Sequence, residues 1–190
     1  MAELQRDFDA IAIGASAGGV EALTVLLQSL RRGFRPAILV VLHLPAQRPS
    51  LLCEVMARHC ALPVREAVDK QPVAPGCVFI APPDYHLLVE PQRTLALSVD
   101  PPVLHSRPAI DPLFESAALA YGRRLLALVL TGASADGSEG AMQVRRCGGT
   151  LWVQRPEDAL MPQMPEAALQ RAGADEVMSL QAMASRLASA

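Results

Sequence analysis

Three residues of the types that cooperate in acyl transfer each follow a short apolar run in this chain. Ser16 lies in a glycine-rich loop, His43 directly follows the run AILVVL, and Asp136 lies in the loop TGASADG. A serine nucleophile, a histidine base and a carboxylate that orients the imidazole form the usual machinery of serine hydrolases. We therefore take Ser16, His43 and Asp136 as the candidate catalytic residues.

The glycine-rich loop around Ser16 is compatible with more than one function. A dinucleotide-binding loop requires G-x-G-x-x-G, but a serine occupies the second glycine position here, where its side chain would block a pyrophosphate. A P-loop requires Gly-Lys-Ser/Thr, which is absent. The segment Gly14–Gly18 matches the G-x-S-x-G of a nucleophile elbow. A serine in such a turn also binds phosphate or caps a helix in many proteins.

His43 and Asp136 each have a structural interpretation as well. A histidine at a strand end can be a core residue that bonds to the backbone, and an aspartate after a strand can cap the next helix. The chain order Ser, His, Asp also differs from the Ser, Asp, His order of α/β-hydrolases. Their common location favours catalysis, because ligands of open α/β sheets bind beyond the carboxyl ends of the strands.

The elements that must position these residues alternate between strands and helices. Short apolar runs predict strands buried on both faces, and apolar residues at every third or fourth position predict helices. The expected strands are Phe8–Ile13, Ala37–Leu42, Cys77–Ala81, Leu125–Leu130 and Thr150–Val153. The expected helices are Gly19–Arg32, Ser50–Ala61, Asp111–Gly122, Asp136–Cys147, Pro165–Ala172 and Ser179–Ala188.

The proline-rich middle of the chain interrupts this alternation. Nine of the sixteen prolines lie between Pro72 and Pro112, which argues against helix there. His86–Glu90 and Thr94–Val99 flank a short turn and predict a β-hairpin. The whole pattern predicts an α/β fold with a doubly wound, mostly parallel, Rossmann-like sheet and one antiparallel hairpin. The length of 190 residues suits a single catalytic domain over residues 1–190.

Composition and charge exclude several classes of protein. The net charge of −2 provides no positive excess for binding nucleic acid. The hydrophobic content of 51% and charged content of 19% exclude a disordered chain. No apolar run reaches the roughly 18 residues of a membrane span, and the N-terminus lacks a secretory signal. We therefore expect no membrane insertion. The four cysteines lack the spacing of a zinc site, and we expect them to be reduced thiols in a cytoplasmic protein.

Five motifs spread from about Asp9 to Ala168 resemble one known family. They are IGASAGGVEAL, VVLHLP, IAPPDYHLLVE, RPAIDPLFESAA and LTGASADGSEG, in this order. Together they resemble the catalytic domain of the chemotaxis protein-glutamate methylesterase family, CheB. That family has a serine in the first glycine-rich loop, a histidine that ends the second strand and an aspartate in a T-G-x-x-x-D-G loop. These positions fall on Ser16, His43 and Asp136.

The resemblance implies an activity and a partner. It implies hydrolysis of glutamate γ-methyl esters on the cytoplasmic helices of methyl-accepting chemotaxis receptors, with deamidation of receptor glutamines in some members. It implies no metal and no organic cofactor. The family's phospho-receiver domain has no counterpart in this sequence, so we expect a stand-alone domain, constitutive or controlled by a separate regulatory protein. Many members have a hydroxyl residue after the serine, where this chain has Ala17. Many also have Met-Gly in the aspartate loop, where this chain has Ala133-Ser134.

Two other functions stay open on the sequence alone. One is a serine hydrolase of small esters on the same scaffold. The other is a non-catalytic module whose glycine-rich loop holds a phosphate or a nucleotide. Serine-directed reagents would label Ser16 only in the catalytic cases, whereas a nucleotide would raise the thermal stability of a binding module.

Overall fold

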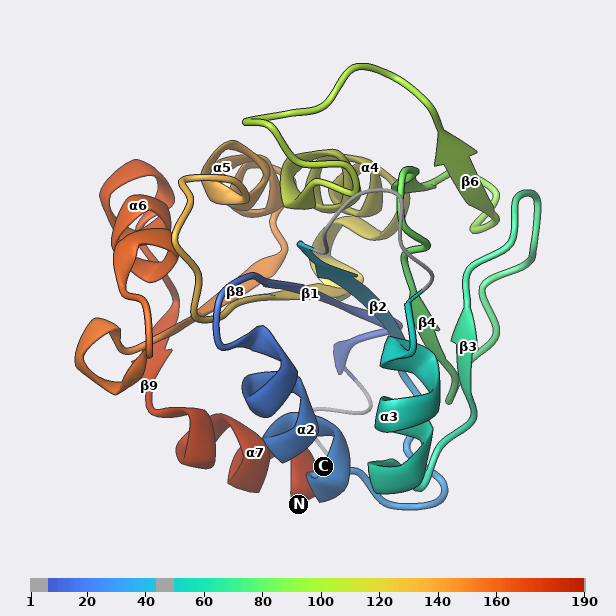
Figure 1. The fold of residues 1–190 in the computed structure, drawn as a ribbon, viewed down its shortest axis with the longest axis horizontal. Coiled ribbons are helices and arrows are strands. Elements are labelled where there is room, and N and C mark those ends of the chain that lie inside the picture. Colours follow the sequence, from blue (N-terminus) through green and yellow to red (C-terminus); the bar gives the residue numbers. More distant parts are fainter. Residues whose placement is uncertain (1–6, 44–49, 190) are drawn as a thin grey trace.

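The described part of the chain, residues 7–43 and 50–189 of a computed structural model, contains a central sheet of seven parallel strands (Figure 1). The strands are β1 (Ala10–Ala15), β2 (Ala37–Leu42), β3 (Val64–Glu66), β4 (Val78–Ile80), β7 (Leu125–Val129), β8 (Thr150–Gln154) and β9 (Glu176–Met178). Their order across the sheet is β3-β4-β2-β1-β7-β8-β9. β5 (His86–Val89) and β6 (Leu95–Ser98) form a separate antiparallel pair. The predicted sheet and hairpin are therefore confirmed.

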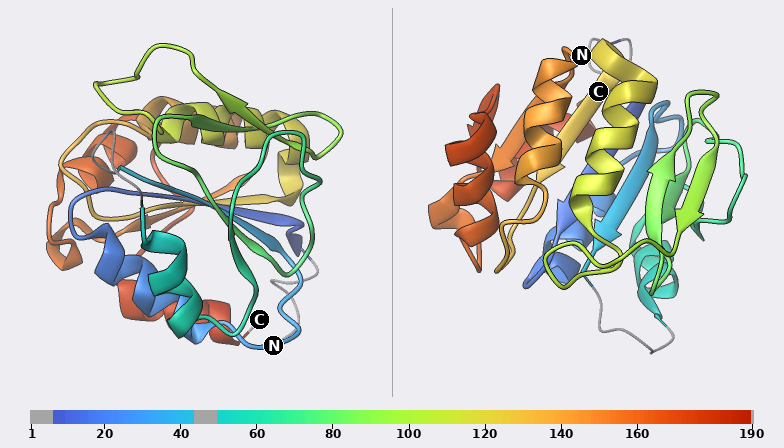
Figure 2. Two further views of the ribbon diagram at one scale, coloured as in Figure 1. Left: turned by 45° about the vertical axis from the view of Figure 1, so that its right-hand side comes forward. Right: turned by 90° about the horizontal axis from the view of Figure 1, so that it is seen from above.

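Helices cover both faces of the sheet (Figures 1 and 2). One face packs against α2 (Gly19–Ser29), α3 (Leu52–His59) and α7 (Leu180–Ala188). The other packs against α4 (Ile110–Tyr121), α5 (Ser138–Arg146) and α6 (Gln163–Ala172). Among the helices of the described residues, none combines the length and the apolar composition that a bilayer-spanning helix needs.

The three central strands are buried along their whole length because helices cover both of their faces. Every residue of β1, β2 and β7 is buried, which explains why their sequences are continuous apolar runs. Ile11 and Ile13 of β1 face the α2 layer, while Ala10 and Ala12 face the α4 layer. The central strands thus form one rigid platform between two apolar layers.

The carboxyl ends of the central strands lie level with one another at the topological switch point of the sheet. Ala15 of β1 pairs with Leu42 of β2, and Gly14 of β1 pairs with Val129 of β7. From β1 the chain first adds strands on the β2 side and later on the β7 side. Ligand sites of open α/β sheets lie at such a point.

Some element boundaries differ from the sequence-based expectations. β3 and β9 were not predicted, because each has only three residues and includes exposed or half-exposed charged side chains. The helix predicted over Ser50–Ala61 is α3, which begins only at Leu52, and Leu51 before it is 63% exposed. The helix predicted to start at Asp111 begins at Ile110, so Ala109 occupies the N-cap and Asp111 lies inside the first turn.

Candidate active site

The ends of β2, β1 and β7 bring the three predicted site residues to one edge of the sheet. Ser16 directly follows β1, His43 directly follows β2, and Asp136 lies in the loop after β7. The His43 amide donates to the Ala15 carbonyl at 3.1 Å, and the Ser16 amide donates to the Thr131 carbonyl at 2.9 Å. These bonds continue the strand ladders past their ends. They hold the serine between the strands that carry the other two residues.

His43 and Asp136 form a short hydrogen-bonded pair. Nε2 of His43 lies 2.7 Å from Oδ2 of Asp136. The Asp136 side chain is fully buried and the His43 side chain is 12% exposed, so the imidazole lies between the carboxylate and the surface. Because Nε2 faces the carboxylate, Nδ1 is the ring nitrogen that remains to take a proton. The residues that follow His43 in its motif, Leu44 and Pro45, lie outside the described residues.

Four N–H groups converge on the Asp136 carboxylate. Oδ2 accepts hydrogen bonds from His43 and from the Ile110 amide, the latter at 2.6 Å. Oδ1 accepts from the amides of Asp111 at 3.0 Å and Gly137 at 2.9 Å. Ile110 and Asp111 form the first turn of α4, whose N–H groups have no partner within the helix. The buried carboxylate therefore occupies the positive end of that helix.

This position corrects the structural interpretation of Asp136 as the cap of the following helix. α5 begins at Ser138, its N-cap is Gly137, and no side chain caps it. Asp136 instead caps α4, which starts 26 residues earlier in the chain. Its capping function and its contact with His43 use the same carboxylate, so one residue orients both the helix and the imidazole.

The electrostatics of this edge favour a single negative charge beside the imidazole. Burial is the largest influence on Asp136 and raises its pKa, but the hydrogen bonds from His43, Ile110 and Asp111 outweigh it and lower the pKa below its usual value. Asp111 differs, because burial and the nearby charge of Asp136 raise its pKa to about 7, although the hydrogen bond from the Gly140 amide acts to lower it. That amide donates to Asp111 Oδ1 at 2.7 Å. At mildly acidic pH, Asp136 is thus the ionised member of the pair.

Thr131 connects the serine loop to the aspartate loop. Its carbonyl accepts the Ser16 amide, and its hydroxyl donates to the Ala17 carbonyl at 2.9 Å and accepts the Met161 amide at 2.9 Å. Its own amide donates to the buried Oε1 of Gln154 at 2.9 Å. Sequence reasoning missed both supporting residues. Thr131 lies in a quoted motif with no assigned role, and no sequence signal distinguishes Gln154 from other strand ends.

Two glycines allow the loops to approach each other. Gly18 is left-handed with φ of 78° and turns the chain from Ser16 into α2. Ser16 itself has no positive φ, unlike the strained serine of a nucleophile elbow. A Cβ on Gly132 would lie 2.9 Å from Cβ of Ser16 and 2.6 Å from the methyl of Met164. The aspartate loop therefore packs directly against the serine.

The arrangement contains the groups needed for acyl transfer. Ser16 is half-buried, and no hydrogen bond occupies its hydroxyl within residues 7–43 and 50–189. In the same ranges the amides of Ala17 and Gly18, at the start of α2, have no acceptor. Amides beside a nucleophile at a helix N-terminus are suited to hold a developing oxyanion. Across the described ranges, no three His, Cys, Asp or Glu side chains are placed to hold one metal ion.

Known proteins are similar to this chain over most of its length. Residues 11–187 match the family model described as CheB methylesterase. One relative, from Leptospira interrogans (serovar copenhageni), is named putative protein-glutamate methylesterase/protein-glutamine glutaminase. It is 36% identical over 178 residues, which cover 94% of this chain and 92% of the relative's length. A Rhodospirillum rubrum relative, named protein-glutamate methylesterase/protein-glutamine glutaminase 1, is 42% identical over 93% of this chain. This chain spans about half of that relative's length, because the match covers 47% of it.

A solved structure has the same fold. The crystal structure of the Thermotoga maritima CheB methylesterase catalytic domain matches with a TM-score of 0.91 and 31% sequence identity. The match covers 96% of this chain and 98% of that one. The similarity therefore includes the central strands and the loops at their carboxyl ends.

Proposed function

The chain belongs to the CheB methylesterase family, and from this premise we propose that it is a protein-glutamate methylesterase with Ser16, His43 and Asp136 as its catalytic residues. The observation that carries the residue assignment is the 2.7 Å contact between His43 and the buried Asp136, beside Ser16 at the switch point of the sheet. A serine, a histidine and an ionised carboxylate in this arrangement perform acyl transfer on several unrelated folds.

In the first half of the proposed reaction, Ser16 attacks the carbonyl carbon of a glutamate γ-methyl ester. Its proton passes to Nδ1 of His43, and the ionised Asp136 stabilises the imidazolium that forms. The amides of Ala17 and Gly18 hold the oxyanion of the tetrahedral intermediate. The bond to the methoxy oxygen then breaks, the imidazolium protonates that oxygen, and methanol leaves. An acyl ester on Ser16 remains.

In the second half, water replaces methanol. His43 takes a proton from the attacking water, the bond between the acyl carbon and Ser16 Oγ breaks, and the serine recovers its proton from the imidazolium. The product is a glutamate carboxylic acid, which ionises at neutral pH. A glutamine amide processed by the same groups would release ammonia, which is the second activity in the relatives' names.

We place the ester on the cytoplasmic helices of methyl-accepting chemotaxis receptors. An apolar rim beside the serine supports a protein substrate. Leu160 is 73% exposed, and its side chain lies 2.9 Å from where a Cβ on Gly18 would be. Ala17, next to the serine, is also exposed. A protein substrate that covered Ser16 would bury this exposed leucine, which would contribute to its binding.

The experiment that tests this function compares two esters. Methanol release should show a kcat/KM at least about 100-fold higher on methylated receptor membranes than on a small soluble methyl ester, because remote contacts contribute to transition-state binding. The reverse preference would favour a small-ester hydrolase. If a serine-directed phosphonate failed to label Ser16, both hydrolase functions would be contradicted, and thermal stabilisation by a nucleotide would favour the binding module.

The supporting role of Thr131 gives a smaller effect that is specific to catalysis. We expect Thr131→Val to lower kcat about tenfold with less change in KM, because the Ala17 carbonyl and Met161 amide lose their partner and the serine loop loosens. Thr131→Ser keeps the hydroxyl and is the matched control, expected within about twofold of wild type. Steady-state kinetics of both variants decide, and a loss in Thr131→Ser as large as that in Thr131→Val would contradict the role of the hydroxyl, because Thr131→Ser keeps it.

A further inference from the structure

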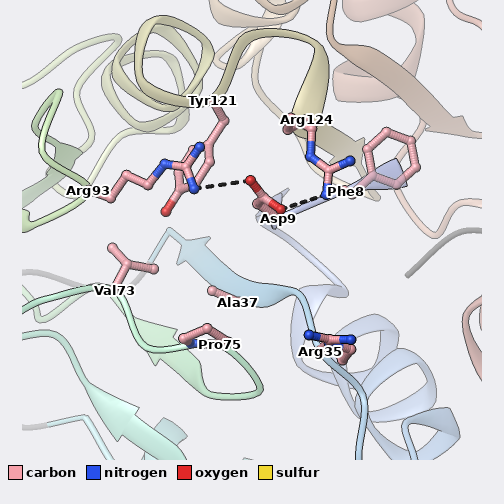
Figure 3. A pocket seen from close by; sticks show the side chains of 9 residues that line it. All are labelled: Phe8, Asp9, Arg35, Ala37, Val73, Pro75, Arg93, Tyr121 and Arg124. Carbon is pink, nitrogen blue, oxygen red and sulfur yellow. Dashed lines mark hydrogen bonds and ion pairs between the residues drawn. The ribbon is translucent and has the colours of Figure 1, made fainter. Parts of the chain in front are cut away.

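A hollow of about 380 Å³ lies on the edge of the sheet opposite to Ser16 (Figure 3). Three of its lining residues mark the amino ends of the central strands. Asp9 precedes β1, Ala37 begins β2 and Arg124 precedes β7. The volume falls within the range of small-molecule sites, about 300 to 1,000 Å³. None of the proposed catalytic residues lines this hollow.

The charged side chains of the hollow are organised around one carboxylate. Asp9 Oδ1 accepts a hydrogen bond from Arg124 at 2.7 Å, and Oδ2 accepts one from Arg93 at 3.0 Å. The hydrogen bond from Arg124 is the largest influence on Asp9 and lowers its pKa, so the carboxylate is ionised at neutral pH. Arg35 also lines the hollow. Asp7 adds a second negative charge close to Arg124, so three positive charges face two negative ones and the net charge is +1.

The guanidinium groups are held apart on two sides of the hollow. In Figure 3 the row Arg93, Asp9 and Arg124 lies on one side, and Arg35 lies on the other. The Arg93 guanidinium stacks over the ring of Tyr121 at 4.8 Å, which fixes its plane. Within the described ranges no carboxylate pairs with Arg35. An anion between the two sides would meet guanidinium groups from three segments of the chain, of which Arg93 and Arg124 are held in place by Asp9.

An apolar wall completes the hollow. Val73 and Pro75 lie on the side away from the Arg93–Asp9–Arg124 row, and Phe8 lies beside Arg124 (Figure 3). A ligand that matches this lining has one strongly anionic group and one compact apolar part.

We propose that this hollow binds a small organic phosphate monoester. The phosphate lies between Arg35 and the pair Arg93 and Arg124, and the organic part lies against Val73 and Pro75. A phosphate monoester carries a charge of about −1.5 to −2 at neutral pH and three acceptor oxygens, which can reach guanidinium groups on both sides of the hollow, whereas a carboxylate has only two oxygens. Planar guanidinium groups also match the geometry of phosphate oxygens. The site is separate from the proposed catalytic edge.

Calorimetric titration with phenyl phosphate at about 0.15 M ionic strength tests the proposal. We expect one saturable site with a Kd below about 1 mM. Arg35→Glu should weaken binding by at least about tenfold, because it removes a charge-assisted donor and adds a repelling charge. Arg32→Glu is the matched control, since Arg32 is exposed three residues earlier, does not line the hollow and undergoes the same charge change. It should bind within about twofold of wild type.

Three outcomes would overturn the proposal. One is the lack of saturation up to about 10 mM phenyl phosphate. Another is equal weakening by Arg32→Glu and Arg35→Glu, which would indicate only a general electrostatic attraction. The third is much tighter binding of a phosphoserine peptide, which would assign the hollow to a phosphorylated protein. Phosphonate labelling of Ser16 should be unchanged in both variants, so this result is independent of the proposed hydrolase function.

Discussion

Ser16→Ala should abolish methanol release from methylated chemoreceptors, with kcat lowered by about 10³- to 10⁶-fold. The substitution removes the proposed nucleophile and leaves His43 and Asp136 in place. The fold should be unaffected, because within the described residues the Ser16 hydroxyl has no hydrogen-bond partner to lose. The thermal midpoint should therefore stay within about 2 °C of wild type. Methanol production and thermal unfolding are measured on the same preparation.

Ser185→Ala is the matched control for this variant. Ser185 is exposed on α7, far along the chain from the site, and its hydroxyl bonds only to the backbone one turn earlier. The kcat of Ser185→Ala should equal that of wild type. A serine-directed phosphonate should label Ser185→Ala at Ser16 and should not label Ser16→Ala. If Ser16→Ala kept more than about a tenth of the wild-type rate, a different nucleophile would have to be sought.

Asp136→Asn should lower kcat by about 10³- to 10⁴-fold. The asparagine amide would donate to Nε2 of His43, so the ring proton would move to Nδ1, the nitrogen that must accept the Ser16 proton. The imidazolium would also lose the carboxylate that stabilises it at 2.7 Å. Steady-state methanol release measures the loss. Asp100→Asn, an exposed position that loses the same charge, is the control and should keep full activity.

The same variant should lose stability in a pH-dependent way. An amide cannot accept all four N–H groups that Asp136 binds, so the free energy of unfolding should fall by about 1 to 3 kcal/mol at pH 7. The pKa of Asp136 is lower in the folded protein than in the unfolded chain. Its charge therefore stabilises the fold at pH values above the unfolded-state pKa, and this contribution disappears as the pH falls through the folded-state pKa. The deficit of Asp136→Asn should thus shrink below about pH 4.

Urea unfolding of Asp136→Asn and Asp100→Asn at several pH values checks this dependence. A deficit that stayed constant from neutral to acid pH would show that the shape of the side chain, and not its charge, stabilises the start of α4. Loss of the Asp136 charge should also lower the pKa of Asp111 from about 7, because that charge is one of the causes of its elevation.

The sequence alone was sufficient to predict the central architecture, because parallel strands buried on both faces must be apolar along their whole length. Ala37–Leu42 was predicted at the bounds that β2 has, and Leu125–Leu130 differs from β7 by one residue. The prediction Phe8–Ile13 was two residues early for β1. The rule that ligands bind beyond the carboxyl ends of such strands then selected the three site residues, whose catalytic roles remain predictions.

The edge strands of the sheet and the arrangement at the start of α4 could not be predicted in this way. β3 and β9 pair along one side only, so their few residues do not form an apolar run. Asp111 has the residue type of a helix cap, yet it lies inside α4 and binds the Gly140 amide of α5. Local preference was overridden by the packing of one helix against another.

The chemistry of the site was likewise divided between sequence and tertiary structure. The positions of Ser16, His43 and Asp136 after buried strands follow from the sequence, because strand ends are visible in local hydrophobic pattern. Only the tertiary structure decided that Asp136 faces Nε2 of His43, that it caps a helix starting 26 residues earlier, and that Thr131 joins the two loops. These are contacts between segments far apart in the chain. Hydrophobic periodicity reports the surroundings of a single element and does not specify which donor from another element will reach a buried carboxylate.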